Sequence, residues 1–121
     1  MNELFVFDTY AIIEIIKGNR NYVPYLDSEI VINNFIFAEL CYNLLRDNDI
    51  HADEYMNKYS SFINSVNSEW IEEAMKFRLK WKKRKVSIAD CIGYIMAKKL
   101  GVKFLTGDKE FYGVENVEFV R

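Results

Sequence analysis

Short runs of apolar residues alternate along this chain with longer segments in which apolar residues recur every three or four positions. Residues 4–7 (Leu-Phe-Val-Phe) precede a helical pattern that stops at Gly18, and residues 30–32 (Ile-Val-Ile) precede a second one, from about Phe35 to Arg46. Residues 102–106 and 117–120 are two more strand-like runs. Strands that alternate with helices build βαβ units. The pattern therefore predicts an α/β fold with a mainly parallel central sheet flanked by helices.

The middle of the chain predicts three further helices. Amphipathic patterns cover residues 52–63, 70–81 and 87–100, and Gly101 closes the last of them. Residues 70–81 also alternate locally as in a strand, but helical spacing over the longer window favours a helix. The polar residues 46–49 and 18–21 are candidate flexible segments.

The length of 121 residues predicts a single domain that spans residues 1–121. No apolar run reaches the roughly 18 residues of a membrane helix, and Met1-Asn2-Glu3 lacks the positive start of a signal peptide. Cys41 and Cys91 are isolated, which indicates neither a disulfide framework nor a zinc site. We therefore expect a cytoplasmic protein with no membrane segment.

Two aspartates follow strand-like runs directly. Asp8 comes after residues 4–7, and Asp108 comes after residues 102–106 with only Gly107 between. Because ligands of open α/β sheets bind at the carboxyl ends of the strands, both are candidate ligand residues. Aspartate is also common at helix N-termini, where its side chain caps the helix. The sequence leaves both interpretations open.

Two further carboxylates lie within helical patterns. Glu39 is the only charged residue from Ile30 to Leu45, and a buried carboxylate must be paired, protonated or bound to a cation. Alternatively, Glu39 lies on the solvent-exposed face of an amphipathic helix. Asp90 stands three residues after Ser87, as in a capping box. Gly93 on the same helical face leaves space beside Asp90 for an ion and a phosphate.

Together these four carboxylates form a candidate metal site. Clustering raises the cost of ionising them all, and a hard divalent cation relieves that cost. Mg²⁺ or Mn²⁺ suits such oxygen ligands, and either ion can activate water for phosphodiester hydrolysis. Ser87 and Thr106 are placed to orient ligands or waters.

Other catalytic arrangements have little support in the sequence. His51, the only histidine, belongs to no Ser-His-Asp or Cys-His pattern, and no phosphate-binding glycine motif occurs. Seven of the sixteen Lys and Arg residues fall within residues 76–85, interleaved with aromatic and apolar residues. This run predicts contacts with nucleic-acid phosphates, and a solvated helix face is the alternative. The candidate RNA-binding residues are Lys82, Lys83, Arg84 and Lys85.

With these motifs in hand, the chain resembles the PIN-domain ribonucleases, the family that includes VapC-type toxins, over essentially its whole length. Residues 4–9 (LFVFDT) resemble the family's strand that ends in Asp, and residues 37–40 (FAEL) resemble its helix with an inward Glu. Residues 87–90 (SIAD) and 105–111 (LTGDKEF) resemble its last two acidic motifs. Tyr10 departs from the small polar residue that the family often has beside the first Asp. Glu110 stands where a further Asp is frequent.

The resemblance implies a single PIN-like domain that cleaves RNA endonucleolytically with Mg²⁺ or Mn²⁺. The implied catalytic and metal-binding residues are Asp8, Glu39, Asp90 and Asp108. The implied supporting residues around them are Thr9, Ser87, Thr106 and Glu110.

The resemblance also implies partners. Members of the family are often homodimers, and the toxins among them are inhibited by a cognate antitoxin. Tyr22, Tyr25 and Tyr42 are candidate exposed residues for a dimer interface. Two alternatives remain: a non-catalytic PIN-like module that binds RNA or a protein, and a phosphoacceptor domain of the receiver type. The second fits poorly, because Asp8 has no adjacent acidic residue.

Overall fold

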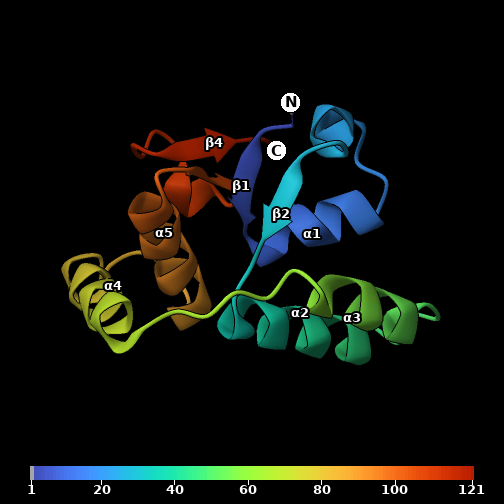
Figure 1. Cartoon of the computed structure of the whole chain (residues 1–121), viewed down its shortest axis with the longest axis horizontal. Helices are drawn as coiled ribbons and strands as arrows, with labels where there is room; N and C mark the ends of the chain where they lie inside the picture. The colour runs from blue at the N-terminus through green and yellow to red at the C-terminus, as the bar shows by residue number, and fades with distance from the viewer. Residues whose placement is uncertain (1) are drawn as a thin grey trace.

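The computed structural model describes residues 2–121 as a four-stranded parallel sheet flanked by helices (Figure 1). The strands are β1 (Leu4–Phe7), β2 (Glu29–Val31), β3 (Lys103–Thr106) and β4 (Val117–Phe119). The helices are α1 (Thr9–Ile16), α2 (Asn34–Arg46), α3 (Ala52–Ser60), α4 (Ser68–Lys80) and α5 (Ile88–Leu100), with the short 3₁₀ helices η1 (Arg20–Tyr25) and η2 (Lys109–Phe111). Among the described residues, no helix combines the length and the hydrophobicity needed to cross a membrane.

The order of the strands brings the ends of β1 and β3 together. The order is β2-β1-β3-β4, and every neighbouring pair is parallel, as the alternation of elements predicted. Phe7 pairs with Leu105, and the N–H of Asp8 donates to the Leu105 carbonyl at 3.0 Å. The chain leaves β1 toward β2 on one side and returns to β3 on the other. This is a topological switch point, where open α/β sheets bind their ligands.

Helix α5 forms the centre of the core. Residues 89–97 are all buried, and the helix packs on α2, α4, β1 and β3. A Cβ atom at Gly93 would lie 2.8 Å from Cε1 of Phe104 and 3.0 Å from Cδ1 of Ile36. The absence of a side chain at Gly93 therefore lets α5 approach the sheet closely. The helix carries Asp90, one turn before Gly93, toward the ends of the strands.

Gly93→Ala is therefore expected to destabilise the protein by about 1 kcal/mol. The added methyl group overpacks the contact with Phe104 and Ile36, which costs about 1–3 kcal/mol, and the better helix propensity of Ala returns a part of that. Urea unfolding measures the change. The double variant Gly93→Ala/Phe104→Leu should be more stable than the single variant Phe104→Leu. An unchanged midpoint for Gly93→Ala would contradict the tight packing of α5.

Some boundaries differ from the sequence prediction. Helix α3 ends at Ser60 instead of residue 63, because Ile63 forms a parallel bridge with Ile32. The N–H of Ile32 donates to the Phe62 carbonyl at 3.1 Å, and the N–H of Asn64 donates to the Ile32 carbonyl at 2.8 Å. These bonds satisfy backbone groups just beyond β2 that would otherwise lack partners. A second difference is η1, which begins inside a segment expected to be flexible.

The prediction that Tyr22 is exposed was wrong. Its side chain is fully buried, and its hydroxyl donates to the Val120 carbonyl at 2.6 Å. Tyr25 is half-buried and donates to a carboxylate oxygen of Glu118. Tyr42, on α2, is exposed as expected. The two hydroxyls fasten η1 to β4 and to the residue that follows it.

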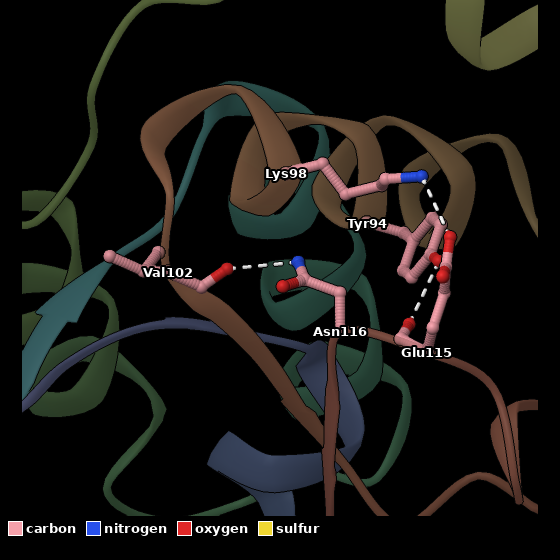
Figure 2. Close-up of polar contacts among 5 residues, drawn as sticks. All are labelled: Tyr94, Lys98, Val102, Glu115 and Asn116. Carbon is pink, nitrogen blue, oxygen red and sulfur yellow. Dashed lines mark hydrogen bonds and ion pairs between the residues drawn. The ribbon is translucent and has the colours of Figure 1, made fainter.

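The turn before β4 is held by α5 (Figure 2). The Tyr94 hydroxyl donates to the Glu115 carbonyl at 2.9 Å, and Nζ of Lys98 lies 3.3 Å from Oε1 of Glu115. Nδ2 of Asn116 donates to the Val102 carbonyl at 2.9 Å. These contacts fix β4 beside β3 and so support the strand that leads to Asp108.

Candidate metal centre

Three carboxylates converge where β1 and β3 end. One oxygen atom from each of Asp8, Glu39 and Asp90 lies within 4.8 Å of the other two. Asp8 directly follows β1, Glu39 lies on α2 and Asp90 lies in the first turn of α5. An octahedral Mg²⁺ holds its oxygen ligands at about 2.0–2.1 Å, so opposite ligands are roughly 4 Å apart. The three side chains therefore fit around one divalent cation after small movements.

Asp8 is buried without enough hydrogen bonds. Its Oδ2 accepts from the Thr106 hydroxyl at 2.6 Å, while its buried Oδ1 has no partner among the described residues. Burial raises the pKa of Asp8 well above its ordinary value, and the charges of Asp90 and Glu39 raise it further. Although Asp8 precedes α1, its side chain makes no capping bond. The capping interpretation of Asp8 is wrong, and a cation is the partner that its chemistry fits.

Asp90 combines capping with a place in the cluster. The N–H of Ser87 donates to Oδ2 of Asp90 at 2.8 Å, and the N–H of Asp90 donates to the Ser87 hydroxyl at 3.0 Å. This is the predicted capping box. It leaves Oδ1 of Asp90 available as a ligand. Burial raises the pKa of Asp90 to about 6, and the charges of Glu39 and Asp108 contribute to the rise.

Glu39 faces the other carboxylates from α2. Its side chain is half-buried, and Asn43, one turn later, lines the same hollow. Tyr42 and Arg46 lie on the exposed part of the helix. Glu39 therefore lies at the border between the hollow and the exposed face of α2. Among residues 2–121 no donor is bonded to its carboxylate, which leaves both oxygens for a cation or a water.

Asp108 lies at the rim of the cluster. It lines the hollow that holds the other three carboxylates but is not one of the three mutually close residues. Its Oδ1 accepts from the N–H of Glu110 at 3.0 Å, so its predicted capping role is confirmed. The four carboxylates meet in one hollow, with three of them at its centre.

The hollow has a volume of about 350 Å³ and contains residues that the sequence analysis missed. Glu14 lines it from α1, Lys17 lines it directly after that helix, and Asn43 lines it from α2; Tyr10, noted in the sequence beside Asp8, lies on the same side as Glu14 and Lys17. The signal was present in their spacing: Tyr10, Glu14 and Lys17 repeat at intervals of four and three, and Asn43 follows Glu39 by four. The complete lining is Asp8, Thr9, Tyr10, Ile13, Glu14, Lys17, Glu39, Asn43, Lys85, Ser87, Asp90 and Asp108.

The sequence profile of the PIN domain matches residues 5–117. The chain belongs to the PIN domain family. No curated protein sequence matches it.

Solved structures share the fold of this PIN domain. A chain of a toxin–antitoxin complex from Klebsiella pneumoniae is 22% identical, with a TM-score of 0.71, and the match covers 94% of this chain and 95% of that one. VapC20 of Mycobacterium tuberculosis, a toxin that cleaves the sarcin-ricin loop, is 16% identical with a TM-score of 0.79, over 98% and 100% of the two chains. VapBC2 of Rickettsia felis is 16% identical with a TM-score of 0.69, and the match covers 98% of this chain and 99% of that one.

Three of the predicted supporting residues of this PIN domain make contacts beside the cluster. The Thr106 hydroxyl donates to Asp8 and accepts from the N–H of Asp108 at 3.1 Å, so it links two of the acidic residues. Ser87 caps α5 through Asp90. The Thr9 hydroxyl donates to the Ile36 carbonyl at 3.4 Å, which docks α1 on α2 one turn before Glu39.

Glu110 contacts residues 82–85, which we call the basic loop, and does not line the hollow of the four carboxylates, which we call the acidic hollow. Its carboxylate accepts from the N–H of Lys85 at 3.2 Å, and its carbonyl accepts from Nη1 of Arg84 at 2.6 Å. The four predicted RNA-binding residues do not all line the same hollow. Lys85 lines the acidic hollow, Lys82 and Arg84 line a second hollow, and Lys83 lines neither.

Proposed function

We propose that this PIN domain is a divalent-metal-dependent endoribonuclease that hydrolyses RNA phosphodiester bonds. The observation that carries the proposal is the unpartnered, buried Oδ1 of Asp8, close to the carboxylates of Glu39 and Asp90. A buried negative cluster of this kind is costly unless a cation or protons neutralise it. The same arrangement would serve no purpose in a protein that only needed to cap its helices.

Each carboxylate has a proposed role. Asp8 and Asp90 lie deepest and would hold Mg²⁺ or Mn²⁺ directly, with Asp108 joining them from the rim. The bound cation would supply Lewis acidity for the attack of water on a phosphodiester. Glu39, whose carboxylate has no protein donor, would complete the ligand set or accept a hydrogen bond from the attacking water. Thr106 would hold Asp8 and the Asp108 backbone in position.

RNA is the proposed substrate because cations border the acidic hollow. Lys85 and Lys17 both line it, and an RNA strand needs such charges beside an acidic centre to offset phosphate repulsion. Lys82, Lys83 and Arg84 continue the positive charge along the loop after α4. VapC20, with the same fold, is described as a toxin that cleaves the sarcin-ricin loop.

We further propose that the chain is the toxin of a toxin–antitoxin pair and forms a homodimer. Several similar structures come from toxin–antitoxin complexes. A basic antitoxin segment would complement the acidic hollow. Purification together with a small protein encoded by the neighbouring reading frame, and a dimeric mass in light scattering, are the expected results.

The cation supplies the direct test of the proposed activity. Purified protein should cleave a structured RNA in Mn²⁺ and stop when a chelator is added. Saturation at about one hundred times the dissociation constant should add roughly 2.7 kcal/mol to the free energy of unfolding. Cleavage that survives the chelator would refute the proposal. Absence of both cleavage and thermal stabilisation would favour the non-catalytic binding module.

A further inference from the structure

A second hollow lies beside the acidic one, on the surface formed by α4 and the loop after it. Its volume is about 280 Å³, close to the lower bound of roughly 300 Å³ for small-molecule sites. Its lining contains three cations, three apolar side chains and no carboxylate. The lining residues are Met75, Arg78, Leu79, Lys82, Arg84 and Val86. We call it the basic hollow.

One strip of backbone separates the two hollows. Arg84 and Val86 line the basic hollow, whereas Lys85 and Ser87 line the acidic one. This alternation is that of an extended segment, in which successive side chains point to opposite sides. The two hollows are therefore only one residue apart along this strip, so a strand of RNA that leaves the acidic hollow over Lys85 reaches the basic hollow directly.

The strip is fixed to the element that follows Asp108. Nη1 of Arg84 and the N–H of Lys85 both bond to Glu110 of η2, at 2.6 Å and 3.2 Å. The guanidinium of Arg84 also lies 4.2 Å from the centre of the Trp81 ring. The relative position of the two hollows is therefore set before any ligand binds, which lowers the cost of binding to both.

The cations of the basic hollow lack counter-ions. Within the described part of the chain, no ion pair involves Arg78, Lys82 or Arg84. Nε of Arg78 donates to the Val86 carbonyl at 3.2 Å, which anchors the side chain and leaves its terminal N–H groups for a ligand. Guanidinium groups held in this way suit phosphate oxygens.

The apolar part of the lining favours a nucleotide over a bare anion. Leu79 is 70% exposed although it is a large apolar residue, and it lies one turn after Met75 on α4. Apolar side chains between cations offer a surface for the face of a base while the cations hold the adjacent phosphates.

We propose that the basic hollow binds one nucleotide of a single-stranded RNA segment that flanks the bond held in the acidic hollow. The proposal rests on the proposed function, because it takes RNA as the substrate. It assigns Arg78, Met75 and Leu79 to substrate binding, in addition to the basic loop.

Binding is measured without cleavage, by fluorescence anisotropy of a labelled single-stranded oligoribonucleotide in the presence of a chelator. The double variant Arg78→Gln/Lys82→Gln is expected to bind about tenfold more weakly, since two charge-assisted hydrogen bonds are lost. Lys76→Gln/Lys80→Gln is the matched control: it removes the same charge from the same segment but from exposed residues that line neither hollow. It should weaken binding no more than about twofold. Equal losses in the two variants would overturn the proposal.

The role of the apolar side chains in the basic hollow is tested with Leu79→Ser. It should weaken oligoribonucleotide binding about threefold and leave the binding of inorganic phosphate unchanged, because only the base loses its contact. Leu100→Ser, at the far end of α5, is the control and should change neither. A Leu79→Ser variant that binds RNA like the parent, or an oligo-glutamate peptide that binds the hollow in place of RNA, would refute the nucleotide assignment.

Cleavage kinetics separate this proposal from the proposed function. With Mn²⁺, the Arg78→Gln/Lys82→Gln variant should raise KM with kcat nearly unchanged, as expected for binding lost equally in the ground and transition states. If this variant shows metal-dependent cleavage with an unaltered KM, only the proposal about the basic hollow is overturned. If the parent protein cleaves no RNA but the variants still change oligoribonucleotide binding as expected, only the nuclease proposal is overturned.

Discussion

Asp90→Asn is expected to lower metal-dependent RNA cleavage by about 1,000-fold or more while the fold is kept. Loss of a direct metal ligand should exceed the roughly 10–100-fold effects typical of residues that only support ligands. The substitution is nearly isosteric, and the amide oxygen of Asn can still accept the hydrogen bond from the N–H of Ser87. The loss would therefore report on the charge of Asp90 and not on the start of α5. Single-turnover cleavage in Mn²⁺ and circular dichroism are the measurements.

Ser87→Ala is the matched control for Asp90→Asn. It breaks the capping box from the other side, because the Ser87 hydroxyl no longer accepts from the N–H of Asp90, yet it keeps the carboxylate. It should cost about 1 kcal/mol of stability and lower cleavage by no more than about tenfold. Asp53→Asn, on the exposed side of α3, should change nothing. If Ser87→Ala were as inactive as Asp90→Asn, the carboxylate of Asp90 would act through the helix cap and not through a metal.

The sequence predicted the fold well because its strands are mostly apolar and its helices are amphipathic. Residues 5–7 and 104–106 are buried parts of strands that local composition identifies, and Gly101 ends α5 in the left-handed conformation that glycine favours. The bridge between Ile32 and Ile63 could not be predicted, since it joins segments separated by two helices. The 3₁₀ helix η1 has no apolar period that would reveal it.

The site was predictable in kind but not in detail. Asp8, Glu39 and Asp90 were identified from their places at the ends or in the middle of apolar segments, and the structure brings these three together. Whether Asp8 caps α1 depends on where its side chain turns, which is set by the Thr106 hydroxyl across the sheet. The contacts of Glu110 with the basic loop likewise span 25 residues or more. Such contacts follow from the packing of distant segments and leave no local pattern.

Metal-free protein is expected to become more stable as the pH falls from about 7.5 to 5. Burial raises the pKa of Asp90 to about 6, and burial together with the charge of Asp90 raises the pKa of Asp8 well above its ordinary value. In the unfolded chain both groups titrate near pH 3.9. Between the unfolded and the folded pKa values the native state binds more protons, so the free energy of unfolding falls as the pH rises. Asp90 alone should contribute roughly 1 kcal/mol over this interval, and Asp8 adds to it.

Saturating Mg²⁺ or Mn²⁺ should reverse the sign of this dependence. The cation binds the ionised carboxylates, so protons compete with it, and the loaded protein should lose stability as the pH falls. Urea unfolding at several pH values, with chelator and with metal, measures both slopes. Asp90→Asn in chelator should be more stable than the parent at pH 7.5, because one buried charge is gone, and its stability should vary less with pH. Metal-free stability that instead rises with pH would show that Asp8 and Asp90 are not the desolvated, mutually repelling pair on which a metal site at this position depends.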